Sequence, residues 1–132
     1  RSRKLRPRKP QKRLRSRRRN NMKAILNNLR MSPRKVRLAA DAVRGKSVAE
    51  ARAILSFMPK AAALPLRKLL DSAAKNAANI GGISDSSMLT ISNLQVDGGK
   101  TLKRHMPRAH GSAYQILKRT SKITLALAEK KK

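Results

Sequence analysis

The sequence predicts an α+β fold: three helices packed on a small three-stranded antiparallel sheet, with a long extended β-hairpin and a basic N-terminal arm. Three observations lead to this prediction. Three segments between residues 33 and 80 repeat apolar residues at helical spacing, and two segments after residue 88 alternate apolar and polar side chains as strands do. A strongly cationic segment at about 97–120 separates those two strands.

The N-terminal arm is predicted at residues 1–19. This stretch has twelve Lys or Arg, no acid, and only Leu5 and Leu14 as sizeable apolar residues, so it cannot build a core. It also resembles an organellar transit peptide, although two leucines make a poor amphipathic helix. Residues 20–132 are expected to form a single globular domain with one modest core. Charge alone predicts RNA contacts from Arg13, Arg15, Arg17, Arg18 and Arg19.

Start and stop signals delimit two helices. Ser32 as N-cap and Pro33 at the first helical position predict a helix over about 33–44, ending before Gly45. Ser47 and Glu50 form a capping box for a second helix that Pro59 stops. The predicted core faces are Val36, Ala39, Ala40 and Val43 on the first helix, and Ala51, Ile54, Leu55 and Met58 on the second.

The third helix is predicted from about 60 or 65 to 80. Pro65 then falls in its first turn, where a missing amide costs little. Gly81-Gly82 is a natural place for a left-handed cap. The helix is expected to bury Leu66, Leu70, Ala73, Ala77 and Ile80.

The apolar period changes to that of strands from Met88 onward. Leu89 and Ile91 fall in one phase and Leu94 and Val96 in the other, so a strand here needs a bulge near Ser92-Asn93. A later strand is predicted where Ile123, Leu125 and Leu127 alternate with smaller residues. A weaker strand is predicted over 23–30, with Ile25 and Leu29 facing the core.

The cationic segment from Asp97 to Lys122 joins two adjacent strands of one sheet. The simplest connection is a hairpin whose arms reach about 25 to 30 Å beyond the core, at ~3.3 Å per residue. A lone two-stranded ribbon is marginal in water, so a partner is expected to hold it. A disordered solvated loop is the alternative, and the rarity of long structureless loops disfavours it.

Composition indicates that this partner is a polyanion. The chain has 34 Lys and Arg against 6 Asp and Glu, a formal charge of +28 on 132 residues, and self-repulsion at that density destabilises a compact state. Nucleic acid relieves the repulsion, because each cation on a phosphate releases condensed counterions. One Tyr and one Phe leave little stacking surface, so phosphate and shape contacts are expected instead of base-specific readout.

Three motifs carry a resemblance to a known family. SPRKVRLAADAVRGK at 32–46, LLDSAAKNA at 69–77 and LKRHMPRAHGSAYQILKRTSKIT at 102–124 resemble the bacterial-type large-subunit ribosomal protein twenty-two, over roughly Met22 to Glu129. The resemblance implies a structural component of the large ribosomal subunit, in a bacterial cytoplasm or an organelle with a bacterial-type ribosome. The globular part would lie near the polypeptide exit site and the hairpin within 23S-type ribosomal RNA.

The same resemblance implies partners and site residues. The hairpin tip would line the nascent-peptide exit tunnel, near large-subunit protein four at the tunnel constriction and the nascent polypeptide. The tip would consist of Leu102, Lys103, Arg104, His105, Met106, Pro107, Arg108 and Ala109. Ribosomal RNA contacts are expected from Arg34, Lys35, Arg37, Lys100, Lys103, Arg104, Arg108, Tyr114, Lys118, Arg119, Thr120 and Lys122.

Catalytic and metal-ligating residues are not expected. His105 and His110, the only histidines, sit on the predicted hairpin without the Cys or clustered carboxylates that a metal site needs. The six acids are scattered, with no pair placed for acid-base chemistry. The sequence therefore predicts no enzyme activity, metal, cofactor or small-molecule substrate.

Two other classes of basic protein share part of this pattern. A nucleoid or histone-like DNA-compacting protein would have the charge and the Arg-rich arm, yet needs no long structured hairpin. A membrane-surface protein would need an amphipathic helix with bulky apolar residues. The helices here are alanine-rich and need their apolar faces for the core, so no membrane partner is expected.

Overall fold

The structure is a computed structural model that describes residues 22–81 and 87–130. Within those residues, helices and antiparallel strands confirm the α+β class. The predicted arm, with the five arginines expected to contact RNA, and Gly82 of the predicted cap lie outside the described residues. In chain order the elements are β1 (Lys23–Leu29), α2 (Pro33–Asp41), α3 (Val48–Phe57), α4 (Ala63–Gly81), β2 (Leu89–Gly98), β3 (Leu102–Pro107), the 3-10 turn η1 (Ala109–Gly111), β4 (Ala113–Lys118) and β5 (Ser121–Glu129).

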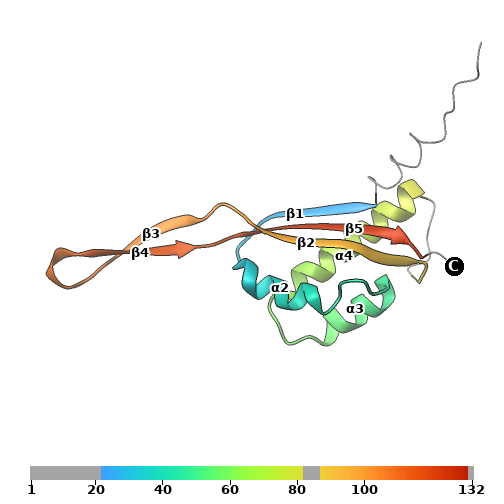
Figure 1. The fold of residues 1–132 in the computed structure, drawn as a ribbon, viewed down its shortest axis with the longest axis horizontal. Coiled ribbons are helices and arrows are strands. Elements are labelled where there is room, and N and C mark those ends of the chain that lie inside the picture. The colour runs from blue at the N-terminus through green and yellow to red at the C-terminus, as the bar shows by residue number, and fades with distance from the viewer. Residues whose placement is uncertain (1–21, 82–86, 131–132) are drawn as a thin grey trace, which may run out of the picture.

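The core lies between a three-stranded sheet and the helices. Strand β5 is central in the antiparallel order β1-β5-β2, and the helices cover one face of this sheet (Figure 1). The register of β2 on β5 shifts between Ile91 and Asn93, which confirms the predicted bulge. Because of that shift, both apolar phases of β2 face the helices and are buried: Leu89, Ile91, Leu94 and Val96.

The helices follow the predicted apolar patterns. The predicted face of α2 is fully buried, although the helix ends at Asp41 and a turn continues to Gly45, whose φ is +76°. In α3 both hydrogen bonds of the Ser47–Glu50 capping box are present, at 3.3 and 3.4 Å. Helix α4 holds Pro65 in its first turn. It buries Leu66, Leu70, Ala73 and Ala77, while the side chain of Ile80 lies outside the described part.

The inward face of β1 differs from the prediction. Ile25 is 56% exposed and points away from the helices, whereas Ala24 and Leu26 pair opposite Leu125 and Ile123 of β5. Opposite residues of an antiparallel pair share a face, so β5 places Ala24 and Leu26 on the core side. A register shift between Leu26 and Leu29 then returns Leu29 to the core, where it packs half-buried.

The predicted hairpin is a two-stranded ribbon, β3 paired with β4, that projects away from the sheet and the helices (Figure 1). Its register runs from Leu102↔Lys118 to Pro107↔Ala113. The chain reverses between Arg108 and Ser112, where the Arg108 N–H donates to the Ser112 carbonyl at 2.8 Å. His110 and Gly111 make this reversal with φ values of 58° and 70°.

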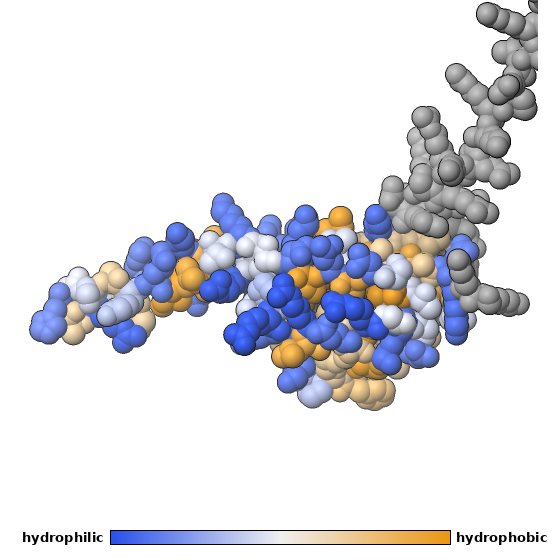
Figure 2. Space-filling view, viewed as in Figure 1, coloured by the Kyte–Doolittle hydropathy of each residue, from blue (hydrophilic) through white to orange (hydrophobic). Residues whose placement is uncertain are grey.

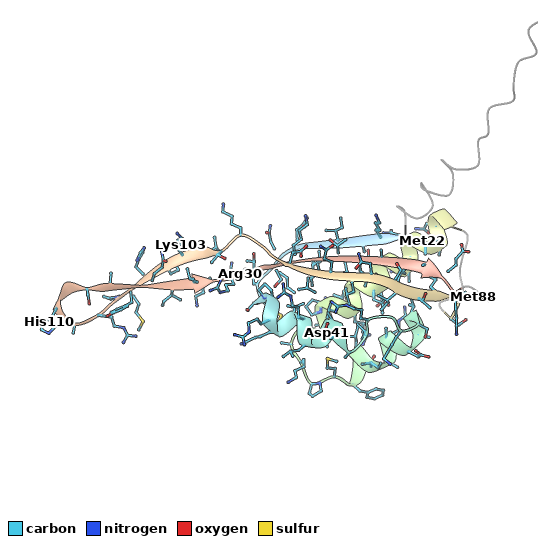
Figure 3. All side chains as sticks on the ribbon, in the orientation of Figure 1. Met22, Arg30, Asp41, Met88, Lys103 and His110 are labelled. Carbon is cyan, nitrogen blue, oxygen red and sulfur yellow. The ribbon has the colours of Figure 1, made fainter. Side chains whose placement is uncertain are left out.

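The position of the turn corrects the predicted tip. Leu102, Lys103 and Arg104 were expected there, but they pair with Lys118, Leu117 and Ile116 in the half of the ribbon nearer the domain. Figure 3 places His110 at the far end and Lys103 closer to the sheet. A reversal this tight requires left-handed backbone conformations, which Gly111 adopts without strain, so the turn forms around it.

A narrow neck joins the ribbon to the sheet. The Gly99 N–H donates to the Thr120 carbonyl at 2.9 Å, and the Thr120 hydroxyl donates to the Lys100 carbonyl at 2.8 Å. Thr120 is only 5% exposed, so its hydroxyl is fixed between the two crossing chains. A Cβ at position 99 would overlap that hydroxyl, whereas a Cβ at Gly98 would meet no atom within 4 Å.

We expect Gly99→Ala to lower the free energy of unfolding by about 1–3 kcal/mol, because the added methyl group forces the neck apart. Gly98→Ala is the matched control and is expected to change stability by no more than ~0.5 kcal/mol. Urea denaturation followed by circular dichroism measures both variants. Equal unfolding midpoints for the two would contradict the close packing at the neck.

Candidate nucleic-acid interface

Exposed cations extend along the whole length of the ribbon. All residues from Lys103 to Arg119 are exposed, and blue polar surface covers much of the ribbon in Figure 2. The two ion pairs among the described residues, Asp41 with Arg44 and Asp71 with Arg52, both lie in the helical part. The ribbon cations therefore have no acidic partner among the described residues.

The ribbon has two chemically different faces, because alternate pairs point to opposite sides. One face carries Arg104 and Lys118 and the Tyr114 ring, and the Arg108 guanidinium lies 5.9 Å from the centre of that ring on this side. Tyr114 remains 64% exposed, so its ring is still open to a partner. This face holds the pairs Leu102↔Lys118, Arg104↔Ile116 and Met106↔Tyr114, and the other holds Lys103↔Leu117, His105↔Gln115 and Pro107↔Ala113.

A second cationic feature lies where the ribbon leaves the domain. An open hollow of about 560 Å³ is lined there by Arg30, Met31, Ser32, Lys35, Leu117, Lys118 and Arg119. The fold thus brings Lys35 of α2 beside Lys118 and Arg119, three residues predicted from distant parts of the sequence. Arg30, which Figure 3 shows at this junction, was not predicted. Its position two residues before Ser32 of the SPRKVR motif was the available signal.

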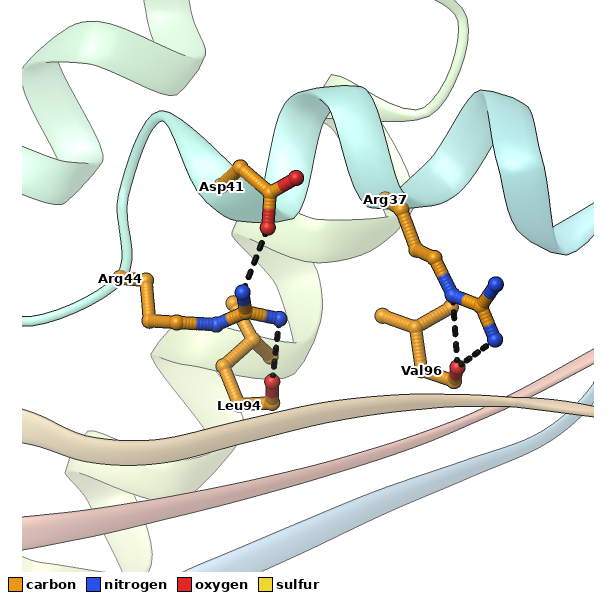
Figure 4. Close-up of polar contacts among 5 residues, drawn as sticks. All are labelled: Arg37, Asp41, Arg44, Leu94 and Val96. Carbon is orange, nitrogen blue, oxygen red and sulfur yellow. Dashed lines mark hydrogen bonds and ion pairs between the residues drawn. The ribbon is translucent and has the colours of Figure 1, made fainter.

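Arg37 has a structural role that the sequence did not reveal. Its Nε and Nη2 donate to the Val96 carbonyl at 3.2 and 3.0 Å (Figure 4). Arg44 likewise donates from Nη2 to the Leu94 carbonyl at 3.0 Å while its Nη1 contacts Asp41 at 2.6 Å. These two guanidinium groups satisfy backbone acceptors on the outer edge of β2 and hold α2 and the turn after it against that edge.

Thr120 does not fit the predicted RNA-facing role. Its side chain is buried and its hydroxyl bonds the Lys100 carbonyl, so it holds the neck and presents no surface to a ligand. The other predicted contact residues are accessible. Lys100 and Arg34 are exposed, and Lys122 lies opposite Asp97 on the sheet face away from the helices.

Neither a metal cluster nor a membrane-spanning helix occurs in the described part of the chain. No group of three or more His, Cys, Asp or Glu there could hold a metal ion. No helix in the same residues is long and apolar enough to cross a bilayer.

Similarity to known proteins identifies the family. Residues 24–128 match the family described as "Ribosomal protein L22p/L17e". The chain belongs to this family. The match covers α2, the neck and the entire ribbon.

Curated relatives agree with this assignment. A "Large ribosomal subunit protein uL22" of Mesoplasma florum is 50% identical over 109 residues, which cover 83% of this chain and 96% of that protein. The proteins of the same name in Deinococcus deserti and Microcystis aeruginosa are 51% and 50% identical, over 82% and 86% of this chain and 77% and 94% of their own lengths. These relatives are named as ribosomal proteins and not as enzymes.

The two roles of arginine on α2 can be separated by substitution. Arg37→Ala is expected to lower the free energy of unfolding by about 1–2 kcal/mol, because it leaves the Val96 carbonyl without its charged donors. Arg34→Ala, one turn earlier, removes an exposed side chain without a described partner and is expected to leave stability within ~0.5 kcal/mol. Thermal denaturation of both variants checks this. An equal loss of stability in both would contradict the contact between Arg37 and the edge of β2.

Proposed function

We propose that this protein is a structural component of the large subunit of a bacterial-type ribosome, where it binds 23S-type ribosomal RNA through phosphate and shape contacts. The observation that carries the proposal is the exposed ribbon of a ribosomal L22p/L17e family member, whose cations have no acidic partner among the described residues. A ribbon of two strands is marginal alone. Embedding it in folded RNA supplies both the counter-charge and the lateral support.

The chemistry of the ribbon favours RNA backbone over bases as its main target. Its cations lie on both faces, so RNA can surround it instead of contacting one side. Tyr114 is the only Phe, Tyr or Trp of the ribbon, which leaves phosphate contact as the main mode of recognition. Lys103, Arg104, Arg108, Lys118 and Arg119 are proposed as the contact residues of the ribbon, with Arg34, Lys35, Lys100 and Lys122 at its base.

We place the tunnel-lining segment at the turn of the ribbon. Residues 108–112 form the narrow end, roughly 30 Å from the neck at ~3.3 Å per residue. Of the eight residues first expected at the tip, Arg108 and Ala109 lie in this turn and Pro107 adjoins it. Leu102, Lys103 and Arg104 are instead proposed to lie along RNA. Large-subunit protein four and the nascent polypeptide are the proposed neighbours of the turn, with the helical part near the exit site.

Competition binding tests the choice of nucleic acid. We expect the full chain to bind folded large-subunit RNA fragments at least about tenfold more tightly than duplex DNA or anionic vesicles at matched salt, because the ribbon needs a partner that can surround it. Fluorescence anisotropy over a series of salt concentrations measures this. Equal affinity for the three partners would show that the protein binds polyanions without selectivity and would contradict the proposal. Preference for duplex DNA would favour the DNA-compacting alternative.

A single cysteine at the turn tests the tunnel assignment. The chain has no native Cys, so His110→Cys carries a photocrosslinker at one defined place. In ribosomes that hold a nascent polypeptide too short to leave the tunnel, we expect this variant to crosslink to that polypeptide. Ala49→Cys, on the exposed side of α3, is the control and is expected not to. Crosslinking from position 110 that is no stronger than from position 49 would contradict the tunnel assignment.

A further inference from the structure

We propose that the hollow at the base of the ribbon is a discrete site for one backbone phosphate of RNA, and that the bound phosphate braces the ribbon against the domain. We call it the base site and define it by Arg30, Lys35, Lys118 and Arg119. That this phosphate belongs to an RNA backbone rests on the proposed function. The binding of a phosphate group rests on the geometry of the hollow alone.

The first argument is charge. Four cations from separate parts of the fold converge on one hollow, and no acid is among its lining residues. Their side chains form no hydrogen bond or ion pair with any residue that the structure describes. The arginines at positions 37, 44 and 52 behave differently, because each bonds a carbonyl or carboxylate of the protein. Mutual repulsion therefore remains in the base site until an anion enters it.

The second argument is the donor set around the hollow. Ser32 lines it and precedes α2, but its hydroxyl makes no capping hydrogen bond, unlike that of Ser47 in α3. The hydroxyl is therefore available to donate to a ligand oxygen. Together with the guanidinium and ammonium groups it offers several donors to one centre, which suits the several oxygens of a phosphate. The partial positive charge at the start of α2 adds to the cations.

The third argument is position. Arg30 and Lys35 belong to the domain, whereas Lys118 and Arg119 belong to the returning arm of the ribbon. The strands of the ribbon contact chiefly each other, and the described hydrogen bonds between the crossing chains at the neck come from Gly99 and Thr120. A phosphate held by both sets of cations adds a second connection beside the neck. With two connections to the domain the ribbon has a fixed direction, whereas with the neck alone it can pivot.

Titration with inorganic phosphate tests the site without RNA. In amide NMR spectra of the full chain at constant ionic strength, we expect saturable shifts concentrated at residues 30–35 and 117–119. Sodium chloride added to the same ionic strength is the control. Shifts that rise without saturation, or that are as large around Lys103, Arg104 and Arg108 as at the base site, would overturn the proposal.

The bracing can be read in the same experiment from the ribbon's motion. The amide relaxation rates of residues 102–118 are expected to approach those of β5 when phosphate saturates the site. In the variant Lys35→Gln the difference is expected to persist at the same phosphate concentration. Unchanged relative rates in the saturated wild-type chain would refute bracing.

A double-mutant cycle then asks whether RNA uses the site. Lys35→Gln and Arg119→Gln should each weaken binding to a folded large-subunit RNA fragment roughly fivefold, and the double variant should lose much less than the product, because both residues hold the same phosphate. Arg67→Gln on α4 and Lys103→Gln on β3 form the control cycle, in which the effects should multiply. Fully multiplicative effects at the base site would reject a shared phosphate.

These outcomes separate the base site from the proposed function. If the chain shows no preference for RNA but phosphate still saturates residues 30–35 and 117–119, the ribosomal assignment fails and the phosphate site stands. If RNA is preferred but the phosphate shifts are diffuse, the assignment stands and the base site is rejected. All four substituted side chains are exposed and have no described bond, so thermal denaturation should show unchanged folding.

Discussion

Pairing of β2 with the central strand β5 determines both the core and the ribbon. The pairing buries the apolar faces of the two strands against the helices, and it continues to Gly98↔Ser121 at the edge of the sheet. From there the same two chain segments cross at the neck and pair again as β3 and β4. The bulge at residues 91–93 sets the register of β2 on β5, and this register in turn sets the direction in which the ribbon leaves the sheet.

Arginine serves two different purposes in this chain. Where α2 and the turn after it face β2, the planar guanidinium groups of Arg37 and Arg44 take the place of a neighbouring strand by binding carbonyls of the open sheet edge. At the base of the ribbon, Arg30 and Arg119 keep their donors free. Each of these arginines contributes the same charge to the net charge of the chain. Whether a backbone carbonyl lies within reach decides which of them bond to the protein itself.

Periodicity and capping signals were sufficient to predict the helices and the bulge in β2, because each depends on nearby residues. The ribbon was predicted as the simplest connection between two adjacent strands. Features set by pairing between distant segments were not predictable. The facing of Ile25 depends on its register with β5, the place of Leu102–Arg104 depends on where the ribbon turns, and the burial of Thr120 depends on the crossing at Gly99. The cluster of Arg30 with Lys118 and Arg119 required the folded chain.

The alternation of the ribbon pairs limits how its length can vary in related chains. Adding one residue to each arm would rotate everything beyond the insertion to the opposite side, so that the surface bearing Tyr114 and Arg108 would exchange places with the surface bearing His105 and Gln115. Two residues per arm restore the original facing. Homologous ribbons that keep the same sidedness at their ends should therefore differ in reach by steps of about 7 Å, twice the rise per strand residue.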